Sequence, residues 1–238
     1  MWLLLTLYKK MAIKAVLFDV DNTLIDFMKM KRACCKAAID AMIDTGLKMS
    51  EKDALKLLYG LYEIHGIESQ RIFQKFTKRI YGKENYRLIS HGVIAYRKMR
   101  ESYLVPYANV IPTLLELKKQ NYQLAIVSDA PIMEAWMRIA SLKLDDFFEV
   151  IITKADARKQ KTYPAPFKTA LKRLGIKPEE AIMIGDRIAR DVNTAKKLGI
   201  HTIYARYGDE NPAEKGKSGA DFEINNISEI LSVLKKIK

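Results

Sequence analysis

The sequence predicts an α/β protein, a doubly wound parallel sheet with a smaller all-helical domain inserted after the first strand. Three observations support this fold class. Short apolar runs rich in Val, Ile and aromatic residues read as strands buried on both faces of a parallel sheet. Helical patterns lie between the later runs, as in strand–helix–strand units. Residues 27–104 contain no such run but repeat a 3.6-residue apolar period.

Five apolar runs are expected as strands, in the order Ala15–Phe18, Leu124–Val127, Val150–Ile152, Ala181–Ile184 and Thr202–Ala205. Pro131 and Pro164 favour helix starts, and Gly175 and Gly199 favour helix ends with a left-handed cap. The predicted helices of this part are Ile132–Leu142, Pro164–Leu174, Arg187–Leu198 and Ser228–Lys238.

The inserted segment, residues 27–104, is expected to fold as a helical domain. One apolar stripe runs from Met30 to Met42, and Ser50 with Asp53 three residues later is typical of a helix start. Residues 12–26 and 105–238 then form the α/β core. Residues 1–11 are expected to be an extension outside the fold, because Met11, followed by Ala12-Ile13-Lys14, is a better start for the chain than Met1.

Composition limits the function classes. The chain has 238 residues and a net charge of +13, and its basic residues are spread along the whole length. The simplest interpretation of this charge is a soluble, Lys-rich surface, and as a partner the distribution favours a small anionic substrate over nucleic acid. Cys34 and Cys35 are adjacent and are the only cysteines, which excludes a disulfide framework and a cysteine zinc site and suits the cytoplasm. No apolar run approaches the length of a membrane span, so no membrane partner is expected.

Polar residues follow the predicted strands where an open α/β sheet binds its ligands. Because the carboxylates would meet in one crevice, where two charges about 4 Å apart repel by about 4 kcal/mol at an effective dielectric of 20, they must hold protons or bind a cation. All-oxygen ligands favour Mg²⁺ where a phosphate also binds. The residues concerned are Asp19 and Asp21, Ser128 and Asp129, Lys161, and Asp186 and Asp191.

This combination resembles the four motifs of the haloacid dehalogenase superfamily, over about Lys14 to Phe222. Asp19, Asp21 and Thr23 match its D-x-D-x-T motif, followed by Leu24. The second-motif hydroxyl is matched by Ser128, the third-motif lysine by Lys161, and the fourth-motif acidic pair by Asp186 and Asp191. The resemblance implies a Rossmann-like core, and the helical insertion is similar to the family's type I cap.

The resemblance also implies a mechanism. Asp19 would attack phosphorus and form an aspartyl-phosphate, and Asp21 would act as general acid and then general base. Mg²⁺ would be held by Asp19, Asp186 and the main-chain carbonyl of Asp21. Asp191 would be a further ligand or a support for the ligands, so the metal set is Asp19, Asp21, Asp186 and Asp191. The substrate phosphate would be held by Ser128, Asp129 and Lys161, with Ser128 and Lys161 counted among the catalytic residues.

Two features qualify the match. Thr162 follows Lys161 where the family often has proline, and Lys154 and Lys159 are rivals for the third-motif lysine; Lys161 is preferred because Pro164 opens a helix three residues later. The dehalogenases that name the superfamily lack an acid two residues after the nucleophile, so Asp21 favours phosphoryl chemistry.

We therefore predict a cytoplasmic Mg²⁺-dependent phosphatase that hydrolyses a small phosphomonoester, as a monomer or homodimer. The open alternatives are a sugar-phosphate mutase with the same intermediate, a 2-haloacid dehalogenase, and a non-catalytic protein or nucleic-acid binder on this scaffold.

Overall fold

The computed structural model describes residues 12–210 and 218–237. Within them the chain forms two compact units, Asp26–Val105 and the remaining described residues. We call these the helical unit and the α/β unit. The N-terminal extension predicted for residues 1–11 lies outside the described residues.

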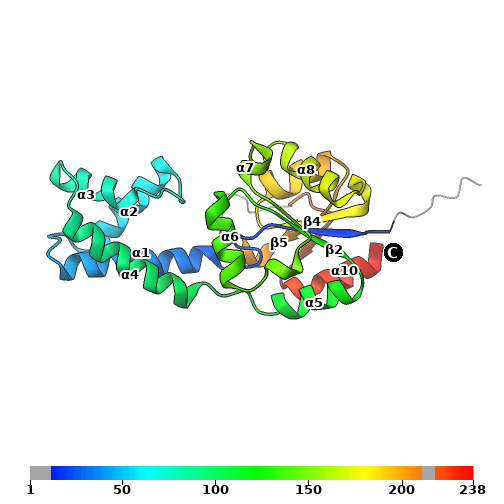
Figure 1. Ribbon diagram of the computed structural model, residues 1–238, viewed down its shortest axis with the longest axis horizontal. Coiled ribbons are helices and arrows are strands. Elements are labelled where there is room, and N and C mark those ends of the chain that lie inside the picture. Colours follow the sequence, from blue (N-terminus) through cyan, green and yellow to red (C-terminus); the bar gives the residue numbers. More distant parts are fainter. Residues whose placement is uncertain (1–11, 211–217, 238) are drawn as a thin grey trace, which may run out of the picture. The chain divides into compact units, whose positions relative to one another are not determined.

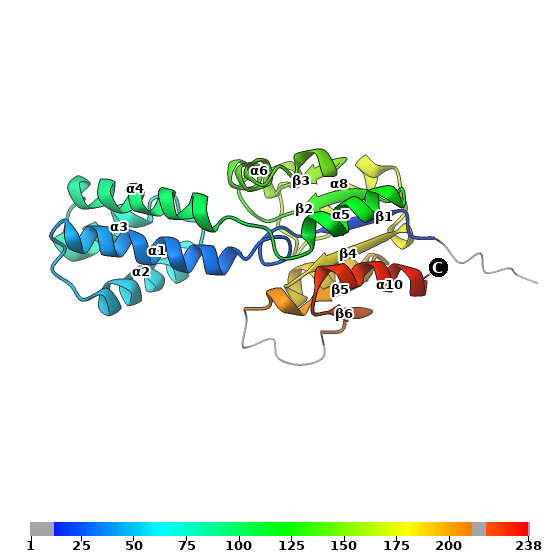
Figure 2. The same ribbon diagram turned by 90° about the horizontal axis from the view of Figure 1, so that it is seen from below.

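The α/β unit is built on a six-stranded parallel sheet in the order β3-β2-β1-β4-β5-β6 (Figure 2). All five predicted runs are strands, and the predicted α/β fold class is confirmed. A sixth strand, β6, was not predicted. The strands are β1 Ala15–Phe18, β2 Gln123–Val127, β3 Val150–Ile152, β4 Ala181–Gly185, β5 His201–Ala205 and β6 Phe222–Ile224.

Helices cover both faces of this sheet. Figure 1 shows α7 and α8 along one face and α5 and α10 along the other. Alternate strand residues such as Leu17 and Met183 pack with Phe167 of α8 in one core cluster, as the two-residue period of a strand requires. The helices of this unit are α5 Val110–Lys119, α6 Ile132–Ser141, α7 Lys154–Ala157, α8 Ala165–Leu174, α9 Asn193–Lys197 and α10 Ile230–Ile237.

The segment after β4 differs from the single helix predicted for Arg187–Leu198. A π-helical turn, Ile188–Val192, comes first, and the short helix α9 follows. A π turn holds one more residue than an α turn and is often found at functional sites. Here it brings the Asp191 side chain back under Gly185 at the end of β4.

The order of the strands creates the place for a ligand. β1 pairs with β2 on one side and with β4 on the other, so the chain's connections run in opposite directions from β1. A crevice at such a reversal, outside the carboxyl ends of the strands, is where open α/β sheets bind ligands. Asp19 follows β1 and Asp186 follows β4, so both lie at this point.

The helical unit contains the helices α1 Phe27–Asp44, α2 Glu51–His65, α3 Ile72–Tyr81 and α4 Tyr86–Tyr103. Its core is formed by apolar faces of all four, including Ile39, Leu58, Phe76 and Leu88. The Ser50 hydroxyl accepts a hydrogen bond from the main-chain N–H of Asp53 at 3.1 Å, which caps α2 as the sequence pattern indicates.

Cys34 and Cys35 are both buried on α1 and form no disulfide, and Cys35 belongs to this helical core. Burial raises the pKa of the Cys34 thiol to about 12 and also raises that of Cys35. Both thiols are therefore protonated near neutral pH, which makes them poor nucleophiles and packing residues of α1.

Candidate active site

The loop after β1 is held in a tight and specific turn. The Asp19 main-chain N–H donates to the carbonyl of Ile184 in β4 at 2.9 Å, and the Leu24 N–H donates to the carbonyl of Val20 at 2.9 Å. Asn22 adopts a left-handed conformation with φ of 58°, and a Cβ on Gly208 would overlap its carbonyl oxygen. The chain therefore turns sharply just after Asp19.

Thr23 lies in the same turn. It is fully buried, and its main-chain carbonyl accepts a hydrogen bond from the Tyr207 hydroxyl at 2.7 Å. The contact ties the turn to the segment after β5.

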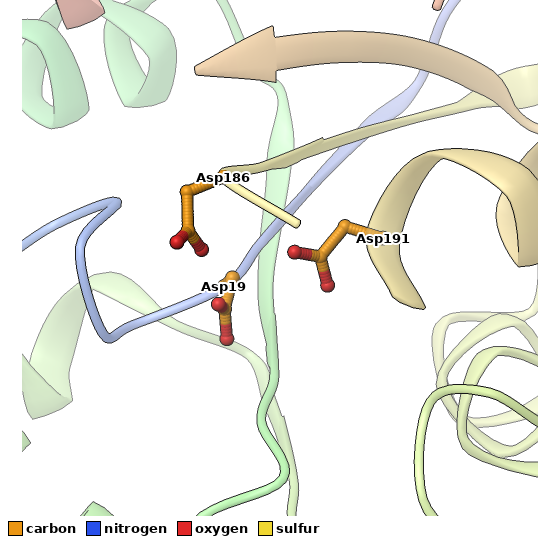
Figure 3. A group of neighbouring side chains, drawn as sticks. All are labelled: Asp19, Asp186 and Asp191. Carbon is orange, nitrogen blue, oxygen red and sulfur yellow. The ribbon is translucent and has the colours of Figure 1, made fainter. Parts of the chain in front are cut away.

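Three buried carboxylates meet beside this turn. Ligand oxygens of Asp19, Asp186 and Asp191 lie within 4.8 Å of one another. Figure 3 shows the three side chains next to one another. They come from the ends of β1 and β4 and from the π-helical turn. Gly185 allows this arrangement, because a Cβ there would overlap the Asp191 side chain. The residues 19, 186 and 191 of the sequence prediction are thus brought together.

Lys161 is buried against two carboxylates of the same cluster. Its Nζ lies 2.7 Å from Oδ1 of Asp19 and 2.5 Å from Oδ1 of Asp191. Burial alone would lower the pKa of this ammonium, but the two carboxylates outweigh it and raise the pKa above the ordinary lysine value. The rival lysines take other places: Lys154 begins α7, and Lys159 lies over the ring of Tyr163.

Asp186 is the carboxylate of the cluster whose buried charge is least offset by hydrogen bonds or ion pairs. Both of its oxygens are buried, and neither accepts a hydrogen bond within the described residues. Burial, followed by the charges of Asp19 and Asp191, raises the pKa of Asp186 to about 9. A buried carboxylate without donors is costly unless a proton or a cation is bound to it.

The cluster fits a magnesium ion. It offers only oxygen ligands, and the ammonium of Lys161 offsets one of its three carboxylate charges. Mg²⁺ takes one or two protein carboxylates and keeps other positions for water and phosphate oxygens. Within residues 12–210 and 218–237, the two oxygens of Asp186 are ligand atoms that accept no hydrogen bond.

Asp191 differs from Asp186 in its partners. Its Oδ2 accepts a hydrogen bond from the Arg187 main-chain N–H at 3.0 Å, and its Oδ1 is the oxygen beside Lys161. Both oxygens of Asp191 are thus in use. The arrangement favours a role for Asp191 in holding the lysine.

Ser128 and Asp129 lie at the end of β2, before α6. The Ser128 side-chain oxygen accepts a hydrogen bond from the Ala130 N–H at 3.1 Å. Asp129 accepts from the Lys161 main-chain N–H at 2.8 Å and from Nη1 of Arg190 at 3.2 Å. The Asp129 carboxylate therefore fixes the backbone that carries Lys161.

The side chain of Asp21 is not a member of the three-carboxylate cluster. Its Oδ2 accepts a hydrogen bond from Nη1 of Arg138 at 2.7 Å. Arg138 belongs to α6 and its side chain is only 5% exposed. Neither Arg138 nor Arg190 was singled out from the sequence, because no motif marks them and their partners lie 117 and 61 residues away.

The model of the haloacid dehalogenase-like hydrolase family matches residues 16–205 of this chain. The chain belongs to the haloacid dehalogenase-like hydrolases. The recognition made from the sequence and the prediction of a hydrolase are confirmed. The match covers all four motif regions, from the turn after β1 to the π-helical turn after β4.

Proteins of similar sequence come from several organisms. A glyceraldehyde 3-phosphate phosphatase from Pyrococcus furiosus is 35% identical over 225 residues, which cover 94% of each chain. A protein of the same name from Methanocaldococcus jannaschii is 30% identical and covers 95% of this chain and 99% of its own. The crystal structure of a HAD phosphatase from Thermococcus onnurineus has a TM-score of 0.69 at 26% identity, covering 93% of this chain and 98% of that one.

Among the helices of residues 12–210 and 218–237, none combines the length and the apolar character that crossing a membrane requires.

Proposed function

We propose that this protein is a Mg²⁺-dependent phosphatase that hydrolyses a small phosphomonoester through an aspartyl-phosphate on Asp19. The observation that supports it best is the buried contact of Asp19 with Lys161, beside the donor-free carboxylate of Asp186. A carboxylate held against an ammonium is suited to approach an anionic phosphate, because the ammonium offsets the repulsion between them.

In the first step an oxygen of Asp19 attacks phosphorus and the bond from phosphorus to the ester oxygen breaks. The ester oxygen takes a proton from Asp21 and leaves as an alcohol. In the second step water attacks the same phosphorus, and Asp21 accepts a proton from that water. The bond between Asp19 and phosphorus breaks, which regenerates the carboxylate and releases phosphate.

Asp19, Asp186 and the main-chain carbonyl of Asp21 would hold the Mg²⁺, which when bound neutralises negative charge on the phosphate and on the attacking carboxylate. Asp191 contributes by positioning Lys161, since both of its oxygens already have partners. Lys161 provides a fixed positive charge for a phosphate oxygen.

The remaining phosphate contacts would come from the β2 end. The hydroxyl of Ser128 and the main-chain N–H groups that lead into α6 are donors of the kind that bind phosphate at a helix start. Asp129 serves the phosphate indirectly, since its carboxylate holds the main chain of Lys161.

For the substrate we infer a three-carbon sugar phosphate, with glyceraldehyde 3-phosphate as the first compound to test. Two relatives of at least 30% identity, aligned over nearly the whole chain, carry the name glyceraldehyde 3-phosphate phosphatase. In this proposal the helical unit acts as the family's cap and selects the substrate, and the enzyme works in the cytoplasm.

The test is phosphate release from a panel of phosphorylated metabolites, with Mg²⁺ and with EDTA. We expect hydrolysis of a small phosphomonoester that stops on chelation and falls by several orders of magnitude in Asp19→Asn. Asp40→Asn is the matched control, because Asp40 is an exposed aspartate paired with Lys36 on α1. Isomerised product without free phosphate would favour a mutase, and near-normal activity of Asp19→Asn would refute the mechanism.

A further inference from the structure

We propose that Arg138 is a positioning residue that holds the carboxylate of Asp21 in its working orientation, an inference that rests on the proposed phosphatase mechanism. Nη1 of Arg138 donates to Oδ2 of Asp21 at 2.7 Å. The two residues are 117 positions apart in the sequence, so the contact is made by the fold.

Arg138 lies at a buried position, where an arginine side chain is unusual. The face of α6 turned into the protein consists of Ala135, Arg138 and Ile139, while Met133 and Trp136 on the same helix are exposed. A guanidinium taken out of water is costly unless a carboxylate pairs with it in good geometry. The Asp21 carboxylate is that partner, and it is itself 23% exposed as a side chain.

The geometry of this contact allows Asp21 to transfer protons while Arg138 holds its carboxylate. The ion pair engages Oδ2, one of the two carboxylate oxygens of Asp21. Protonation of the other oxygen would therefore leave the hydrogen bond from Arg138 in place, although the neutral carboxyl group no longer forms an ion pair. A planar guanidinium also restricts the rotation of a carboxylate more strongly than an ammonium does.

The helix that carries Arg138 also begins next to the proposed phosphate-binding loop. Ser128 and Asp129 directly follow β2, and α6 starts at Ile132, only three residues after Asp129. One short rigid element thus relates the proposed phosphate site to the proposed general acid. A displacement of about 1 Å in such an arrangement can lower a rate by about a hundredfold.

The experiment measures single-turnover release of the leaving group from two substrates, an alkyl phosphate and p-nitrophenyl phosphate. The alkoxide is a poor leaving group that needs the proton of Asp21, whereas nitrophenolate needs little help. In Arg138→Met we expect the alkyl ester to be cleaved about ten- to a hundredfold more slowly, and the aryl ester to change by less than about threefold.

Three further variants separate positioning from a general effect on the fold. Arg138→Met should cause no further loss in an Asp21→Asn background, because the residue acts through Asp21. Arg138→Lys, which keeps the charge without the planar fork, should recover part of the rate. Arg173→Met is the matched control, since it removes an exposed arginine of α8 that pairs with Asp156 of α7, and it should leave the cleavage of both substrates unaffected.

Equal losses on both esters, or a loss that persists in the Asp21→Asn background, would overturn the role of Arg138. Thermal unfolding of each variant shows whether a lost rate reflects unfolded protein, and Arg138→Lys supplies the comparison if Arg138→Met does not fold. The proposed function fails differently: wild-type protein with Mg²⁺ would then cleave neither ester, and the role of Arg138 would fall with it.

Discussion

Gly185 at the end of β4 is the position where one added methyl group should disturb the site most directly. A Cβ there would lie within 2.5 Å of Cβ, Cγ and Oδ2 of Asp191, whereas ordinary contacts begin near 3.4 Å. Asp191 is fully buried in the π-helical turn, and its side chain must move by about 1 Å to admit the methyl group.

Two consequences of Gly185→Ala can be estimated. Overpacking of this kind destabilises a protein by about 1–3 kcal/mol. Displacing Asp191 also moves the ammonium of Lys161, and a shift of about 1 Å at a reacting centre costs about a hundredfold in rate. We therefore expect kcat/KM to fall by about a hundredfold and the free energy of unfolding to fall by about 1–3 kcal/mol.

The assay compares phosphate release and urea unfolding for Gly185→Ala and Gly60→Ala. Gly60 lies inside α2 with no atom near its missing Cβ, so alanine there should stabilise the protein by about 0.5–1 kcal/mol without affecting activity. Wild-type activity in Gly185→Ala would refute the reasoning that the close approach of Asp191 to the strand is required.

Three further predictions concern ionisable groups. Burial and neighbouring carboxylates raise the pKa of Asp186 to about 9 in the metal-free protein, so the free energy of unfolding should fall as the pH rises toward 9 and this carboxyl group loses its proton. Mg²⁺ must displace that proton to bind, so it should raise Tm more at pH 8 than at pH 6. Equal shifts of Tm at the two pH values would contradict this. Cys34 and Cys35, whose pKa values burial raises, should resist Ellman's reagent until guanidinium unfolds the protein; rapid labelling of native protein would show them accessible. Lys161→Met should lower the free energy of unfolding in EDTA by about 3–5 kcal/mol, because it breaks a buried ion-pair cluster, and an unchanged urea midpoint would refute this.

Five strands of the sheet were predictable because a strand buried on both faces has a largely apolar sequence. Ala15–Phe18 is apolar at every position, and the four similar runs are apolar except at Thr202, as expected for burial on both faces. The strand β6 was not predicted from the sequence, because it has only three residues, with an exposed Glu223 between Phe222 and Ile224. An edge strand of this kind has no continuous apolar run by which to recognise it.

The segment after β4 shows where local reasoning fails. Helical periodicity from Arg187 to Leu198 indicated one helix, and the chain instead forms a π-helical turn before α9. Periodicity records which side chains are buried, and it does not record that Asp191 must turn back toward β4. Tertiary contacts at the site decide this conformation.

The residues of the candidate site likewise fall into those that the sequence identifies and those that only the folded chain reveals. Asp19, Asp186 and Lys161 could be named because strand ends and motif spacing identify them. Arg138 could not be named, since an arginine on an amphipathic helix usually faces solvent and its partner comes from a distant loop. The contact that motivates our further inference is therefore visible only in the folded chain.

The most direct measurement of the central claim is acid-quench trapping of the phosphorylated enzyme. Wild-type protein is mixed with glyceraldehyde 3-phosphate and Mg²⁺, quenched in acid within one turnover, digested and examined by mass spectrometry. We predict a phosphoryl group on the peptide that contains Asp19, and none in Asp19→Asn. Hydrolysis that proceeds with no phosphorylated peptide, or with the phosphoryl group on another residue, would contradict the account.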